Sequence, residues 1–94
     1  QTPATKLDME SILIIGITAD GNYLVDNESR KLNDFEELKN YILENNQKAI
    51  DNNAKTRVRI RSNWNTPIRY TVMLARFCDE LGIVKGIDVI RRAN

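Results

Sequence analysis

Residues 57–91, RVRIRSNWNTPIRYTVMLARFCDELGIVKGIDVIR, contain a strand, a turn, a helix, a glycine stop and a second strand in that order. Val58-Arg59-Ile60-Arg61 alternates apolar and charged side chains, which is the period of a half-buried strand. Pro67 suits the first position of a helix, and Thr66 before it offers a capping hydroxyl. Gly82 is suited to end this helix in a left-handed conformation. We therefore predict two parallel strands joined by a right-handed helical crossover.

The helix of this unit has two neighbouring apolar stripes. The stripe that we predict to face the core consists of Ile68, Val72, Ala75, Cys78 and Leu81. The stripe beside it consists of Tyr70, Met73, Leu74 and Phe77. Two interpretations of the second stripe are open. It either widens the core face or forms a dimer or partner surface, and its four residues are candidate contact residues for the second interpretation.

The first half of the chain predicts a hairpin followed by a helix. The β-branched run at residues 12–18 favours a strand, Asp20-Gly21 is a strong turn signal, and residues 22–25 form the returning strand. Residues 30–32 are predicted to be a short extended piece, and a helix follows them. Its start is predicted at Asn33, with Glu36 completing a capping box.

This first helix is expected to bury one stripe and to fray near Asn45-Asn46, because asparagine prefers caps and turns. The predicted buried stripe is Phe35, Leu38, Ile42 and Ala49. Each helix thus has one apolar face to cover a sheet. We predict an α+β fold of order ββαβαβ, a two-layer sandwich in which a mixed sheet of four to five strands carries both helices on one face. Residues 1–10 are predicted to be a flexible N-terminal linker or arm, and residues 11–94 the folded domain.

The composition argues against several classes of enzyme and metal-binding protein. The 94 residues carry a net charge of +1, include no histidine and include one cysteine. The commonest general base and metal ligand is therefore missing, and a disulfide within the chain is impossible. Cys78 is expected to be a small core residue. We predict no enzyme, no catalytic residue, no cofactor and no metal site.

Three arginines alternate along one predicted strand and should share one face of it. Arg57, Arg59 and Arg61 could form an anion-binding strip for nucleic acid, cell-wall carboxylates or an acidic partner. The plainer interpretation is a solvated sheet face with cross-strand carboxylate partners from Asp88 or Glu28.

The order of these motifs resembles a known family. The hairpin of residues 14–25, the helix start Phe35-Glu36-Glu37-Leu38, and Val58-Arg59-Ile60-Arg61-Ser62-Asn63 before Thr66-Pro67 are similar to the periplasmic domain of ExbD/TolR proteins. The resemblance covers roughly residues 12 to 91 and depends on order and spacing. Asn63 stands where the family has an aspartate, so a contact that needs a carboxylate there is not implied.

The resemblance implies a role in energy transduction. It implies the periplasmic part of a bitopic subunit of a proton-driven motor in the Gram-negative inner membrane, serving outer-membrane transport or envelope maintenance. The implied partners are an ExbB/TolQ-like channel subunit, a TonB/TolA-like transducer and a second copy of the chain, with peptidoglycan as a further candidate. Because the sequence begins with Gln1, we expect a membrane-spanning segment upstream of it.

An alternative class is a small αβ nucleic-acid-binding module that uses the face of Arg57, Arg59 and Arg61. The near-zero net charge and the lack of paired aromatic residues on neighbouring strands argue against it, and we predict no nucleic-acid partner.

Overall fold

The computed structural model describes residues 9–91. The elements in this part of the chain are β1 (Glu10–Ile17), β2 (Tyr23–Val25), β3 (Arg30–Leu32), α1 (Phe35–Asp51), β4 (Lys55–Asn63), α2 (Ile68–Glu80) and β5 (Val84–Ile90). They form one five-stranded sheet of order β3-β2-β1-β4-β5. Strands β1, β4 and β5 are parallel, whereas β2 is antiparallel to both β1 and β3.

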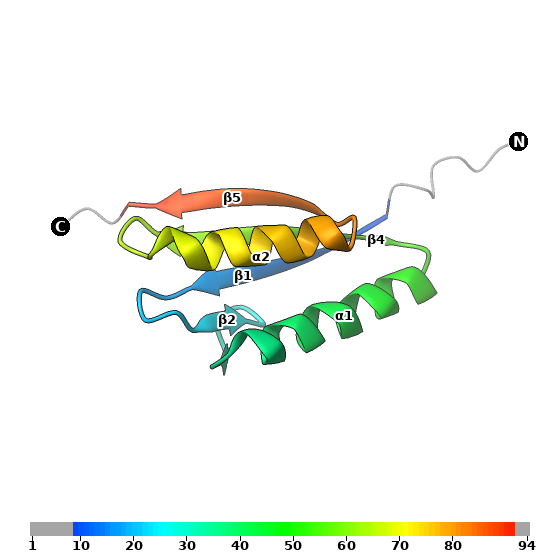
Figure 1. Cartoon of the computed structure of the whole chain (residues 1–94). Helices are drawn as coiled ribbons and strands as arrows, with labels where there is room; N and C mark the ends of the chain where they lie inside the picture. Colours follow the sequence, from blue (N-terminus) through cyan, green and yellow to red (C-terminus); the bar gives the residue numbers. More distant parts are fainter. Residues whose placement is uncertain (1–8, 92–94) are drawn as a thin grey trace, which may run out of the picture.

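Both helices lie on the same face of this mixed sheet (Figure 1). The predicted α+β sandwich is therefore confirmed, and the short extended piece is the third strand of the sheet. The predicted linker extends too far, because Glu10 already belongs to β1, and residues 1–8 lie outside the described part.

The core lies between the sheet and the two helices. Alternate side chains of β1 and β4 point into it, including Ile15 and Ile60, which are fully buried. Leu38 and Ile42 of α1 meet them as predicted, and Cys78 of α2 is a buried core residue. Burying one such aliphatic side chain contributes about 1.5–3 kcal/mol, so this layer supplies most of the driving force for folding.

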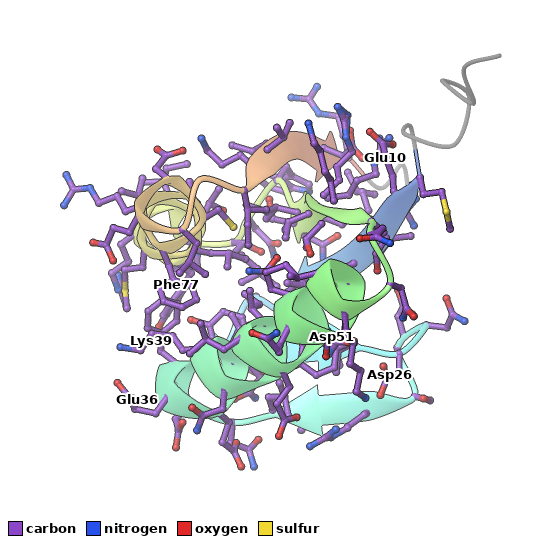
Figure 2. All side chains as sticks on the ribbon, turned by 90° about the vertical axis from the view of Figure 1, so that its right-hand side faces the viewer. Glu10, Asp26, Glu36, Lys39, Asp51 and Phe77 are labelled. Atoms are coloured by element: carbon purple, nitrogen blue, oxygen red, sulfur yellow. The ribbon has the colours of Figure 1, made fainter. Side chains whose placement is uncertain are left out.

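The two helices meet at an aromatic seam. The rings of Phe35 in α1 and Phe77 in α2 stand edge to face, with their centroids 6.1 Å apart. The ammonium group of Lys39 lies 5.5 Å from the Phe35 ring centroid and 3.0 Å from the Glu36 carboxylate. Figure 2 shows Phe77 and Lys39 side by side between the helices, so a cation covers the outer side of the seam.

The predicted turn at Asp20-Gly21 joins β1 to β2. Gly21 has φ +86°, a left-handed conformation that glycine adopts without strain. The turn is closed by the Thr18 amide, which donates to the Asn22 carbonyl at 2.9 Å. A Cβ atom at Gly21 would lie 2.5 Å from Cζ of Tyr70. The turn therefore packs directly on the start of α2.

The cap of α1 is one residue later than predicted. Asp34, not Asn33, is the N-cap, and its carboxylate accepts from the Glu37 amide at 2.8 Å. The Glu37 carboxylate in turn accepts from the Asn33 amide at 2.9 Å. A reciprocal capping pair therefore exists, but between neighbours of the predicted residues. The predicted fraying at Asn45-Asn46 is also wrong: Asn45 donates to the Tyr41 carbonyl, Asn46 accepts from Thr56, and the helix continues to Asp51.

The predicted start of α2 is wrong in its details. Helix α2 begins at Ile68, Pro67 is the N-cap, and no side chain caps the helix. The Thr66 hydroxyl instead donates to the Ile17 carbonyl at 3.3 Å, which connects this turn to the end of β1. The Thr66 side chain therefore bonds to the end of β1 and does not cap α2.

Candidate binding surfaces

The face of the sheet opposite the helices carries the three predicted arginines. Val58, Ile60 and Ser62 of β4 are buried towards the helices, so Arg57, Arg59 and Arg61 project from the other face. No helix of the described residues covers that face (Figure 1).

Carboxylates neutralise two of these three arginines. Arg59 Nη2 lies 2.6 Å from Asp88 Oδ2 on β5, as the plainer interpretation predicted. Arg57 Nε lies 3.6 Å from Glu10 Oε2 on β1, and Arg61 has no ion pair within residues 9–91. Exposed pairs of this kind contribute about 0–1 kcal/mol each, but they remove much of the positive potential that an anion would need.

No local sequence pattern predicted Glu10 as a partner of Arg57. Parallel pairing places Glu10 beside Lys55, close to Arg57, and this pairing joins segments some 45 residues apart. Glu28, the other predicted partner, makes no ion pair in the described part of the chain and lies near Arg61 in a shared surface hollow.

The second stripe of α2 belongs mainly to the core. Leu74 is fully buried, and Tyr70 and Phe77 pack half-buried against the core. Only Met73 is exposed, at 41%. As placed, Leu74 cannot contact a partner without unfolding, and the stripe offers one exposed residue rather than four.

The first stripe of α2 is more exposed than predicted. Ile68 is 71% and Val72 39% exposed, although both were expected in the core. They share a flank of α2 with Asp79, because residues 68, 72, 75 and 79 follow the helical repeat. Asp79 accepts from Lys85 of β5 at 2.6 Å, so this flank faces β5. The sheet ends there, and nothing in residues 9–91 lies beyond it to cover the flank.

Strand β5 adds two exposed apolar residues on the same side. Ile87 and Val89 alternate with Asp88 and so share the helix side with Lys85. They are 48% and 65% exposed. We call the four residues Ile68, Val72, Ile87 and Val89 the α2–β5 patch. It adjoins the outer edge of β5, with which no other described strand pairs.

The titratable groups with shifted pKa values are buried or bonded within the fold. Burial raises the pKa of the Cys78 thiol to about 11, which disfavours the reactive thiolate. Burial, helped by a hydrogen bond donated to Asp26 at 2.8 Å, raises the pKa of Tyr41 to about 12. Burial also raises the pKa of Tyr23. Within residues 9–91 no group of three or more cysteine or acidic side chains is arranged to hold a metal ion.

The surface hollows are small and open. Their volumes run from about 210 Å³, beside Gly16 and Arg61, to about 360 Å³, beside Ile50 and Gly82. A hollow of about 330 Å³ follows one edge of β1. Drug-sized ligands usually occupy concave sites of about 300–1,000 Å³ that enclose most of their surface. The geometry therefore favours recognition of another chain over enclosure of a small molecule.

Comparison with protein-family models, with curated proteins and with solved structures found no match to this chain. In the part of the chain that the structure describes, no helix combines the length and apolar character needed to cross a membrane.

Proposed function

We propose that this chain is a protein-binding adaptor that performs no covalent chemistry. In this proposal it is the periplasmic domain of an inner-membrane motor subunit similar to ExbD/TolR proteins. The full-length protein would be anchored by a transmembrane helix upstream of Gln1 and would work with an ExbB/TolQ-like channel subunit and a TonB/TolA-like transducer. The fold supports this proposal, because the hairpin, the strand–helix–strand unit and the helices on one face are the arrangement that the resemblance implies.

The observation that carries the adaptor role is the α2–β5 patch beside the free edge of β5. An exposed edge strand offers a row of main-chain donors and acceptors, and monomeric proteins usually block such edges with proline, bulges or charges. Strand β5 has no proline, and its one lysine, Lys85, is engaged by Asp79. This edge is suited to pair with another strand.

A second copy of the chain is a suitable occupant of this edge. Antiparallel pairing of two β5 strands about a two-fold axis at Ile87 keeps the helices of both copies on one face. In that register Val84 lies opposite Ile90 of the second copy, and the two Ile87 side chains meet. The apolar patches of the two copies would then adjoin, and a continuous ten-stranded sheet would result.

Sedimentation equilibrium over a range of concentrations tests this self-association. We expect the parent chain to dimerise and Ile87→Lys to raise the dissociation constant at least tenfold, because two ammonium groups would meet at the axis. Leu43→Lys is the matched control, since Leu43 on α1 is 44% exposed and Ile87 48%. A parent chain that stays monomeric at millimolar concentration would contradict the dimer.

The gene sequence upstream of Gln1 tests the motor role separately. We expect one apolar segment of about 20 residues that carries an aspartate, because a spanning helix needs that length and a charge within it marks a proton path. A start codon directly before residue 1 would exclude the motor role, whereas self-association is tested independently by the sedimentation experiment.

A further inference from the structure

The two edges of β1 are used very differently. On one side all eight residues of β1 pair with β4, from Glu10 beside Lys55 to Ile17 beside Ser62. On the other side only Gly16 and Ile17 pair with β2. Figure 1 shows β2 beside only the arrowhead end of β1. In this register Val25, the last residue of β2, lies level with Ile15, so residues 10–14 of β1 have an edge with which no strand among residues 9–91 pairs.

A strained turn keeps this edge free. After Val25 three consecutive residues without glycine's freedom, Asp26, Asn27 and Glu28, take left-handed φ values of 55°, 59° and 69°. The cost relative to the right-handed conformation is about 1–2 kcal/mol for Glu28 and less for Asp26 and Asn27, because aspartate and asparagine adopt the left-handed conformation more readily. The chain turns away here instead of continuing β2 along β1, and backbone strain of this kind is concentrated at functional sites.

A surface hollow follows the free edge. The hollow of about 330 Å³ is lined by four consecutive β1 residues, Ser11 to Ile14. Successive side chains of a strand point to opposite faces, so a hollow that touches all four lies along the edge itself. Asp26 and Asn27 of the strained turn close one end, and Tyr41 of α1 lies on the helix side. We call this feature the β1 slot.

We propose that the β1 slot binds an extended segment of a partner protein as an added strand, collinear with β2. Main-chain hydrogen bonds to residues 10–14 would hold the segment, as in other cases of strand addition. The segment would be about five residues long, because that is the length of edge that β2 leaves free.

The residues that line the β1 slot also predict which side chains the bound segment should carry. Ile12 and Ile14 are exposed on the open face, at 52% and 37%, so alternate residues of the segment should be apolar. Residues pointing to the helix side would meet Ser11, Tyr41 and Asn45, which favours small polar side chains there. Among residues 9–91, Asp26 is the one charged residue that lines the hollow, so a lysine or arginine should lie at that end.

This inference does not depend on the proposed dimer. Strand β4 separates β1 from β5 in the sheet, so the β1 slot and the free edge of β5 face opposite ways. Peptide binding and self-association can therefore be lost separately by mutation.

The test is titration of the parent chain with a blocked hexapeptide, acetyl-Lys-Val-Ser-Val-Thr-Val-amide, followed by amide chemical shifts. We expect the shifts to concentrate on residues 10–14 and 26–27. Two further peptides carry N-methyl groups on complementary sets of alternate residues. Only one set of amides in an added strand points at β1, so one methylated peptide should lose binding and the other should keep it.

A pair of matched variants locates the site. Ile12 and Val84 both lie beside Arg57, on β1 and β5, and they are 52% and 57% exposed. We expect Ile12→Ser to weaken peptide binding roughly fivefold, because an apolar contact is lost, and Val84→Ser to leave it unchanged. Four outcomes would overturn the inference: no binding at millimolar peptide, equal binding of both methylated peptides, shifts centred on β5, or the same peptide affinity in Ile12→Ser and Val84→Ser.

Discussion

Gly21 and Gly82 have similar backbone conformations but different surroundings. Replacing each by alanine therefore distinguishes the cost of backbone strain from the cost of a steric clash. Gly21 and Gly82 have φ values of +86° and +71°. Nothing lies within 4 Å of a Cβ atom built on Gly82, whereas one on Gly21 meets the Tyr70 ring. We expect Gly82→Ala to lower the free energy of unfolding by about 1 kcal/mol, through strain alone.

Gly21→Ala should cost more, about 2–3 kcal/mol, because the methyl group also displaces the Tyr70 ring from the turn. Urea unfolding of the two variants and the parent measures both effects. Equal losses would mean that the contact between the hairpin turn and Tyr70 contributes nothing to stability.

Cys78 reports on opening of the core. Its side chain is fully buried, and burial raises its pKa to about 11, so the folded chain offers almost no accessible thiolate. At pH 8 we expect a disulfide reagent to label the folded chain at least about 10³-fold more slowly than the chain in urea, since labelling requires opening. Fast labelling of the folded chain would show that α2 opens readily.

At the scale of one element, Asn33 and Asp34 at the start of α1 should contribute differently to stability, because only Asp34 caps the helix with its side chain. Asp34→Ala removes the carboxylate that accepts from the Glu37 amide, and we expect a loss of about 1 kcal/mol in the free energy of unfolding. Asn33 contributes only its main-chain amide, so Asn33→Ala should change stability by less than about 0.5 kcal/mol. Chemical denaturation compares the two, and the reverse ranking would place the cap at Asn33.

The sequence predicted the elements because each depends on local patterns. Alternation predicted that Val58 and Ile60 are buried, and helical spacing predicted the same for Leu38 and Ile42. The cap could not be placed, because Asn33 and Asp34 are both good capping residues one position apart. The exposure of Ile68 could not be predicted either, since the helical period identifies an apolar stripe but not the point where the sheet beneath it ends.

At the scale of the whole molecule, the candidate surfaces follow from strand order. The order β3-β2-β1-β4-β5 leaves β5 at an edge, and the short β2 leaves residues 10–14 of one β1 edge free. Neither free edge could be predicted from the local hydrophobic pattern, because strand pairing joins residues far apart in the chain. The arginine strip could be predicted, since it lies within one strand, but its partner Glu10 could not.

One hydrogen bond joins α1 to the turn that closes the β1 slot, and alkaline pH tests it. The Tyr41 hydroxyl donates to the Asp26 carboxylate at 2.8 Å, and the pKa of Tyr41 is raised to about 12, chiefly by burial. An unfolded tyrosine titrates near pH 10. Between about pH 10 and pH 12 the unfolded chain loses this proton while the folded chain keeps it. Its contribution to stability is therefore complete below pH 10 and declines as the pH rises towards 12.

Tyr41→Phe should lower the free energy of unfolding by about 1 kcal/mol at pH 7, where the hydrogen bond is intact. The raised pKa values of Cys78 and Tyr23 act in the same direction, so the variant should still lose stability at high pH, but less steeply than the parent. Urea unfolding at intervals from pH 7 to pH 11 measures the two slopes. Parallel slopes would show that Tyr41 titrates alike in both states and that the contact between α1 and the turn does not hold the hydroxyl protonated.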